Sequence, residues 1–189
     1  MGTTIRTFIA IELPTDVIRR AEAIQEQLTH AGLRLRWVRP QRMHLTLRFL
    51  GDIASERIPE AAAAMQRAAG GIRRLELDAQ GLGVFPGIRT PRVLWMGLGG
   101  QTGALAELRR RLDDALAGNG FAGDAKPFKG HLTLARIKEK IDGRLLLQAI
   151  EACAGFAPVR FQAAEMILFR SDLRPGGPTY TPLARVGFA

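Results

Sequence analysis

The tetrapeptide His-Leu-Thr-Leu occurs twice in this chain of 189 residues, at His44–Leu47 and at His131–Leu134. The two copies lie 87 residues apart, close to half the length of the chain, and they contain two of its three histidines. Recurrence at such a spacing indicates an internal structural repeat. The chain is therefore expected to fold as two related halves.

The segments around the two copies repeat as well. Each copy follows a short apolar, strand-like run and a segment in which apolar residues have helical spacing. After each copy come a second helical segment and then segments with alternating apolar residues, which are typical of half-buried strands. The matching pairs are residues 7–11 and 94–98, 16–30 and 105–116, 58–69 and 145–154, and 75–85 and 159–169. Each repeat is thus predicted to run strand, helix, strand, helix, strand.

This order predicts an α+β fold with two pseudo-symmetric lobes around a central cleft. Each lobe is expected to be a mainly antiparallel sheet with helices on its outer face, because a sheet must bury one apolar face. We expect a single bilobal domain over residues 1–189, with repeats at about 6–86 and 92–170 and with residues 171–189 completing the sheets. A ligand would bind in the cleft between the lobes.

Each His-Leu-Thr-Leu segment is predicted to be a strand, so its side chains alternate between the two faces of a sheet. The leucines would anchor the strand in the core, while His44 and Thr46, and likewise His131 and Thr133, would face the cleft. Two histidines suit acid–base chemistry at a phosphate, since near neutral pH one imidazole can accept a proton while another donates one. The threonine hydroxyls can donate hydrogen bonds to phosphate oxygens.

Two arginines follow the motifs and are candidates for charge-assisted phosphate contacts. Arg48 lies four residues after His44, so strand alternation puts it on the same face as that histidine. Arg136 lies five residues after His131 and needs a β-bulge, or the end of the strand, to reach the cleft.

Other interpretations of these residues stay open. A histidine in an apolar strand is often a packed side chain, although packing gives no reason for its recurrence with threonine at the same spacing. Two histidines can also bind zinc, but no Asp, Glu or Cys recurs with them, and we expect neither a metal nor a cofactor. Phe8, Tyr180, Trp37 and Trp95 either pack in the fold or stack on a base, and packing is favoured.

The chain carries 27 Lys and Arg against 18 Asp and Glu, a net charge of +9, and almost all of its basic residues are arginines. An anionic partner such as RNA or a nucleotide is one explanation, and a solvated basic surface is the other. No apolar run approaches the roughly 18 residues of a membrane span. We expect a cytoplasmic protein that binds no membrane, and a monomer because no coiled coil or long apolar edge is evident.

The paired motif and its surroundings resemble the two-histidine (2H) phosphoesterase superfamily, most closely its RNA 2′,3′-cyclic phosphodiesterase branch, formerly called 2′–5′ RNA ligases. The resemblance covers nearly the whole chain, and the paired motif at this spacing is highly specific to the superfamily. The segments that carry it are Arg6–Pro14, His44–Gly51, Pro91–Trp95, His131–Arg136, Ser171–Gly177 and Tyr180–Leu183. One departure is Gly130, where members of the family often have proline.

The resemblance implies that His44 is the proton donor and His131 the proton acceptor in a metal-independent reaction. In that reaction a terminal 2′,3′-cyclic phosphate of RNA is opened to a 2′-phosphate, and its reversal would account for 2′–5′ ligation. The resemblance also implies phosphate contacts for Thr46, Thr133 and Arg136.

Two alternatives stay open beside this function. One is a non-catalytic module that binds RNA or a nucleotide, which the net charge of +9 also suits. The other is a 2H phosphodiesterase that acts on small cyclic phosphates. The presence of both histidines and both threonines favours an enzyme over a binding module.

Overall fold

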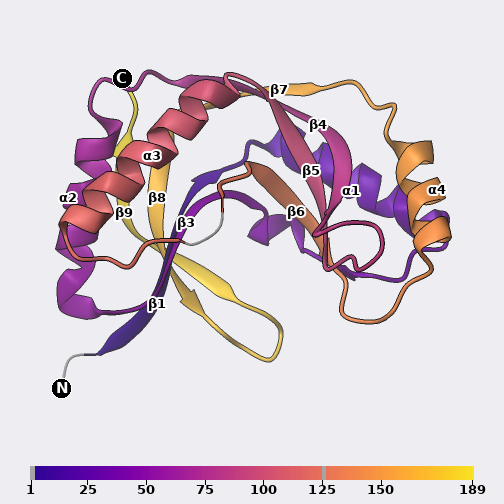
Figure 1. The fold of residues 1–189 in the computed structure, drawn as a ribbon, viewed down its shortest axis with the longest axis horizontal. Coiled ribbons are helices and arrows are strands. Elements are labelled where there is room, and N and C mark those ends of the chain that lie inside the picture. Colours follow the sequence, from indigo (N-terminus) through magenta and orange to yellow (C-terminus); the bar gives the residue numbers. More distant parts are fainter. Residues whose placement is uncertain (1–2, 125–126) are drawn as a thin grey trace.

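The computed structural model describes residues 3–124 and 127–189 (Figure 1). The strands are β1 (Thr4–Glu12), β2 (Arg36–Trp37), β3 (His44–Ala54), β4 (Leu75–Phe85), β5 (Val93–Gly100), β6 (His131–Arg136), β7 (Val159–Ala163), β8 (Glu165–Asp172) and β9 (Thr179–Gly187). The α-helices are α1 (Thr15–His30), α2 (Ile58–Ala69), α3 (Thr102–Gly118) and α4 (Gly143–Cys153). Two short 3₁₀ turns, η1 (Pro40–Arg42) and η2 (Ser55–Arg57), flank β3.

Helices α1, α2 and α4 begin where the sequence has start signals. Pro14 directly precedes α1, and Pro59 stands in the first turn of α2, where proline costs no helical hydrogen bond. The Asp142 carboxylate caps α4 by accepting a hydrogen bond from the backbone N–H of Arg144 at 2.8 Å. Within residues 3–124 and 127–189, no helix is both long and apolar enough to cross a membrane.

The strands form one curled antiparallel sheet in the order β7-β4-β5-β6-β3-β1-β8-β9, with β2 paired to β6 (Figure 1). Helix α1 packs against α4 and β7, and α2 packs against α3, β8 and β9. The predicted α+β fold with a mainly antiparallel sheet and outer helices is confirmed. The two halves share one continuous sheet, where the sequence had suggested a sheet for each lobe.

Each half of the chain supplies strands to both halves of the sheet. β1 and β3 pair with each other, but β4 crosses over to pair with β5 and β7. In return, β8 and β9 complete the sheet beside β1. The motif strands β3 and β6 meet at the pair Leu45 and Leu132, so both motifs lie at the centre of the sheet.

Strand pairing corrects one detail of the repeat alignment. Ala10 pairs with Thr46 and Trp95 pairs with Thr133, so β1 and β5 are related by 85 residues and not by 87. Trp95 therefore occupies the place that Ala10 has in the first half. Gly83 pairs with Trp95, and a Cβ at this glycine would overlap the indole. The ring is thus packed across Gly83, in line with the favoured packing role of Trp95.

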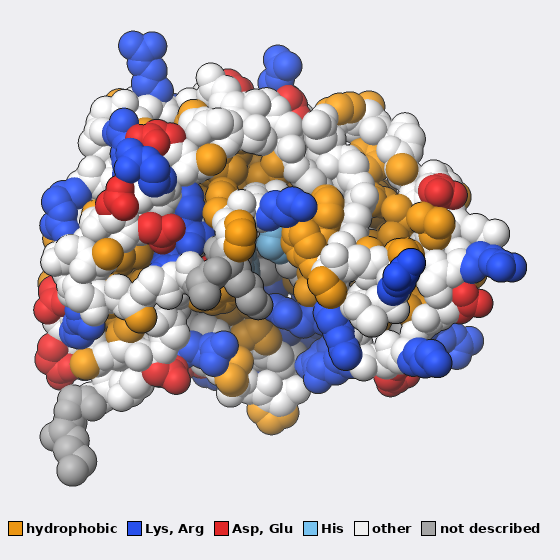
Figure 2. Space-filling view, in the orientation of Figure 1, with side chains coloured by type: hydrophobic (Ala, Val, Ile, Leu, Met, Phe, Trp, Pro, Cys, Tyr) orange, Lys and Arg blue, Asp and Glu red, His pale blue; other side chains and the backbone are white. Residues whose placement is uncertain are grey.

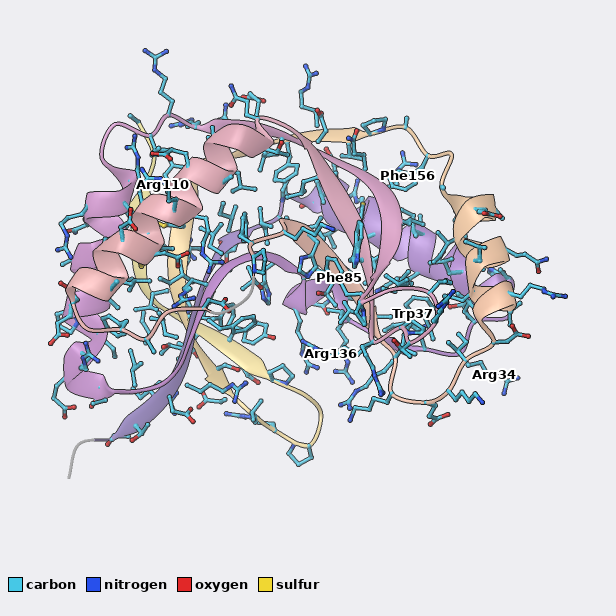
Figure 3. All side chains as sticks on the ribbon, viewed as in Figure 1. Arg34, Trp37, Phe85, Arg110, Arg136 and Phe156 are labelled. Carbon is cyan, nitrogen blue, oxygen red and sulfur yellow. The ribbon has the colours of Figure 1, made fainter. Side chains whose placement is uncertain are left out.

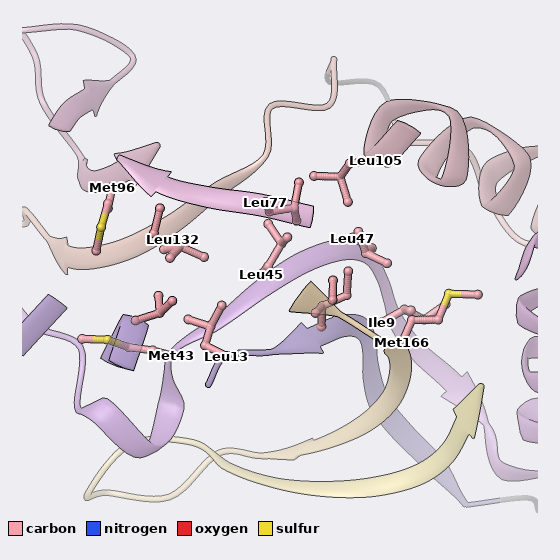
Figure 4. Packing of buried hydrophobic residues seen from close by; sticks show 14 of the residues in the cluster. Ile9, Leu13, Met43, Leu45, Leu47, Leu77, Met96, Leu105, Leu132 and Met166 are labelled. Carbon is pink, nitrogen blue, oxygen red and sulfur yellow. The ribbon is translucent and has the colours of Figure 1, made fainter. Parts of the chain in front are cut away.

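The four motif leucines are at most 1% exposed, as predicted, and each contributes about 1.5–3 kcal/mol by its burial. Figure 4 shows Leu45, Leu47 and Leu132 packed together between Met96 on one side and Ile9 on the other. Because these leucines fix one face of β3 and β6 in the core, the intervening histidines and threonines are turned to the opposite face.

Candidate active site

The central leucine pair brings the polar residues of both motifs together on one face of the sheet. Since β3 and β6 are antiparallel there, His44 comes beside Thr133 and Thr46 beside His131. The two histidines are then diagonal neighbours, which in a regular antiparallel pair lie about 7–8 Å apart. This spacing leaves room for a phosphate between two imidazoles. All four residues are half-buried, so they remain open to a ligand.

Both imidazoles are held by the same local hydrogen bond. The Nδ1 atom of His44 lies 2.8 Å from the backbone oxygen of Arg42, and Nδ1 of His131 lies 2.6 Å from that of Lys129. A carbonyl oxygen only accepts, so each Nδ1 carries the proton of its bond. The Nε2 atom of each ring is therefore the one available for proton transfer.

A β-bulge brings Arg136 to the site. Leu134 is an extra residue in β6, because Thr133 and Ala135 pair with successive residues of β5. Alternation resumes after the bulge, so exposed Arg136 shares the sheet face of His131 and Thr133. This is the bulge that the predicted phosphate contact of Arg136 required.

The same kind of bulge removes Arg48 from the site. Leu47 is the extra residue of β3, because its two neighbours pair with successive residues of β1. Arg48 consequently points into the core, where it is 3% exposed and forms ion pairs of 3.4 Å with Asp113 and with Asp124. The predicted position of Arg48 on the histidine face is wrong, since simple alternation ignored the bulge. Phe49, which is 55% exposed, takes that position.

Aromatic rings surround His44. The ring centroid of Phe8 lies 4.8 Å from that of His44, and Tyr180 meets His44 edge-on at 5.2 Å. Phe8 also packs on Phe169 at 5.3 Å and on Phe49 at 5.8 Å, and is only 2% exposed. Phe8 is thus a packed residue, as favoured, while half-buried Tyr180 borders the site.

His131 has a smaller aromatic neighbourhood. Phe85 meets it edge-on at 5.0 Å, and Trp95 packs on Phe85 at the same distance. Figure 3 shows Phe85 and Arg136 beside the central strands, whereas Trp37 lies farther along the sheet. Trp37 packs against the main core, which agrees with the favoured packing role.

The surroundings of His44 disfavour its charged form. Its pKa is lowered from 6.5 to about 4, mainly by burial, with the hydrogen bond to the Arg42 carbonyl opposing the shift and the positive charge of Arg136 adding to it. His44 is therefore neutral near pH 7 while the site is empty. Figure 2 shows histidine on the floor of a hollow with basic side chains along its rim. An anion bound in this hollow would favour the charged form of His44 and so raise its pKa.

Anion binding is therefore expected to charge His44. At about pH 5.5, sulfate should bind with uptake of up to one proton, because its charge raises the pKa of His44 from about 4. Calorimetry in two buffers of different ionisation enthalpy measures this uptake, and His44→Asn should lose most of it. Equal uptake by wild type and variant would contradict the assignment to His44.

Sequence reasoning missed two buried polar residues behind the site, Gln25 and Arg109, which are 9% and 5% exposed. Their signal was a polar residue among the apolar positions of an amphipathic helix: α1 for Gln25 and α3 for Arg109. Among residues 3–124 and 127–189, no group of three or more His, Cys, Asp or Glu side chains is arranged to hold a metal.

The sequence matches the family described as LigT-like phosphoesterase over residues 11–95 and 99–180. It is 33% identical to an RNA 2′,3′-cyclic phosphodiesterase of Thermotoga maritima, over 97% of this chain and 96% of the relative. It is 35% identical to an RNA 2′,3′-cyclic phosphodiesterase of Thermus thermophilus, over 96% of this chain and 89% of the relative.

Solved structures with the same fold include a protein of Thermus thermophilus, with a TM-score of 0.78 and 29% identity over 97% of this chain and 98% of the other. Another is E. coli LigT in complex with 3′-AMP, with a TM-score of 0.72 and 27% identity over 98% of this chain and 99% of the other. By its sequence match, its relatives and its fold, this chain belongs to the LigT-like phosphoesterase family.

Proposed function

We propose that this protein hydrolyses the 2′,3′-cyclic phosphate at the end of an RNA to a 2′-phosphate, without a metal ion. The observation that carries the proposal is the pair of histidines on one sheet face, each with Nδ1 held by a backbone carbonyl, so that Nε2 is the nitrogen that can transfer a proton. The relatives named RNA 2′,3′-cyclic phosphodiesterase support the choice of substrate.

In this reaction His131 is the general base and His44 the general acid. Nε2 of His131 takes a proton from water, and the water oxygen bonds to phosphorus as the bond from phosphorus to O3′ breaks. Nε2 of His44 gives its proton to the departing O3′, and the phosphate stays on O2′. The diagonal placement suits this step, because the attacking and leaving oxygens lie on opposite sides of phosphorus in an in-line displacement.

The other predicted residues hold the phosphate. Hydroxyls of Thr46 and Thr133 donate hydrogen bonds to its non-bridging oxygens, and the Arg136 guanidinium adds a charge-assisted contact. The negative substrate also raises the pKa of His44 from its low value in the empty site, which makes that residue a proton donor. Both histidines come from one chain, so the reaction needs no second copy, and a cytoplasmic monomer is sufficient for it.

The test is hydrolysis of an oligoribonucleotide with a 2′,3′-cyclic phosphate end in the presence of EDTA, with the position of the product phosphate assigned by NMR. We expect turnover to a 2′-phosphate. A 3′-phosphate product would reverse the donor and acceptor roles. Turnover of small cyclic phosphates but not of the oligoribonucleotide would show that small cyclic phosphates are the substrate class. If the folded protein turned over neither substrate, the non-catalytic binding module would be favoured.

One feature favours RNA over small cyclic phosphates. Arg36 of β2 pairs directly with Arg136 of β6, and like charges facing each other across two strands destabilise a sheet. Neither arginine has a carboxylate partner among the described residues, and residues 27–51 contain no Asp or Glu at all. Positive charge therefore continues from the site past β2 to exposed Arg39. Arg136, Arg36 and Arg39 form a basic track that can bind further phosphates of an RNA chain.

Removal of this track should affect long substrates alone. The double variant Arg36→Gln/Arg39→Gln is expected to raise KM about tenfold for a cyclic-phosphate oligonucleotide, and to flatten its salt dependence by about 0.7 in log–log slope per lost contact. KM for a cyclic mononucleotide should stay within about twofold. Arg73→Gln/Arg144→Gln, which removes the same charge from two exposed sites elsewhere, is the control. Equal effects of both double variants would show that only net charge matters.

A further inference from the structure

Gln25 is a polar side chain in an otherwise apolar position. It is 9% exposed on the face of α1 that buries Val17, Ala21, Ile24 and Leu28. A buried amide without hydrogen-bond partners destabilises the folded state, so a glutamine in this position needs specific acceptors or donors nearby.

The acceptors are two backbone carbonyls, one in the second motif and one directly after β2. Nε2 of Gln25 donates to the oxygen of Leu134 and to the oxygen of Val38, both at 2.9 Å. The Leu134 oxygen also accepts from the backbone N–H of Val38 at 2.8 Å. Leu134 is the extra residue of the β6 bulge, so Gln25 ties helix α1 and the chain after β2 to that bulge.

The first motif has the same arrangement. Nη1 of Arg109, from α3, donates to the backbone oxygen of Leu47 at 2.5 Å, and Leu47 is the extra residue of the β3 bulge. Each bulge is thus held by a buried donor from a helix in the other half of the chain. The recurrence of the arrangement, with different side chains, indicates that the bulges need this support.

We propose that Gln25 is a positioning residue, which holds the Leu134 bulge so that Arg136 faces the phosphate site. Without the bulge, strand alternation would carry Arg136 to the face opposite His131. Gln25 lies on the other side of the sheet from the histidines and touches no reacting group. The inference rests on the proposed phosphate contact of Arg136, through which its effect on the reaction would pass.

A double-mutant cycle tests this dependence. Gln25→Met keeps the shape of the side chain but removes the donor. Arg136→Ala is expected to lower kcat/KM about 10–100-fold, and Gln25→Met about tenfold, mainly through weaker phosphate binding. In the Arg136→Ala background, Gln25→Met should change kcat/KM less than about twofold. Equal losses in both backgrounds would overturn the proposal, as would no loss from Gln25→Met alone.

Destabilisation needs its own control. Ile24→Ala, one residue away and also buried, should lower Tm without lowering kcat/KM at temperatures where the protein stays folded. A loss of activity with Ile24→Ala equal to that with Gln25→Met would assign the effect to general loosening of α1 and overturn the proposal. If Gln25→Met does not fold, Gln25→Asn replaces it, because its shorter amide cannot reach both carbonyls.

A binding measurement separates this inference from the proposed function. Sulfate affinity, measured by calorimetry, requires no turnover. Gln25→Met should weaken sulfate binding when Arg136 is present and leave it unchanged when residue 136 is alanine. An inactive wild type that shows this pattern would refute the proposed hydrolysis but support the positioning role, whereas equal sulfate affinity of wild type and Gln25→Met would refute the positioning role.

Discussion

His44→Asn and His131→Asn are each expected to lower kcat/KM for the cyclic-phosphate oligonucleotide about 10²–10⁴-fold, the range for loss of a general acid or base. Asparagine is the sharpest replacement here, because its side-chain N–H can take over the Nδ1 bond to the carbonyl of Arg42 or Lys129. The variant then keeps that hydrogen bond but has no Nε2 to transfer a proton. Thermal unfolding should show little change in Tm, which separates the loss of chemistry from a loss of fold.

The third histidine provides a matched control. His30 is exposed at the end of α1, so His30→Asn should leave kcat/KM unchanged. Because His44 and His131 act in one transition state, the double variant should be much less impaired than the product of the two single losses. Retention of activity within tenfold of wild type by either single variant would remove that histidine from the mechanism.

Arg109→Met is expected to destabilise the fold by about 3 kcal/mol, the lower end of the range for a broken buried ion pair. Arg109 donates to the Leu47 bulge, pairs with Asp113 at 2.8 Å and with Asp124 at 3.4 Å, and lies over the ring of Phe128 at 5.2 Å. The lower end applies because both carboxylates reach solvent, at 39% and 33% side-chain exposure.

For a chain of this size, such a loss lowers Tm by about 6–12 °C. Arg110→Met is the control on the next residue, where an exposed arginine pairs with Glu107 and Asp114. Exposed pairs are heavily screened by water, so this variant should shift Tm little. Similar shifts for both variants would mean that the buried contacts of Arg109 add nothing beyond an ordinary surface pair.

Strand alternation predicted which motif residues face the site and which enter the core, because the repeated leucines leave each strand one way to bury its apolar side. It failed at Arg48 and left Arg136 dependent on a bulge. The bulges could not be read from local pattern, since the groups that hold them are remote in sequence: Gln25 is 109 residues from Leu134, and Arg109 is 62 from Leu47.

The order of the strands in the sheet also could not be predicted from the pattern of apolar residues. Alternation identified β4 and β8 as strands, but their partners depend on which surfaces pack when the whole chain collapses. The two-residue error in aligning β1 with β5 has a similar cause. Apolar runs look alike when shifted by two, and only the pairing of Ala10 with Thr46 and of Trp95 with Thr133 fixes the register.

The exchange of strands between the two halves matters while the chain is being synthesised. β1 lies between β3 and β8, and β8 is made only at residues 165–172. Until then, one edge of β1 lacks its neighbour, although Thr7–Ile11 is a run of five residues that are all buried in the finished fold. An open apolar edge of this kind invites pairing with other chains. The edge of β1 is therefore open to pairing with other chains until residues 165–172 have been made.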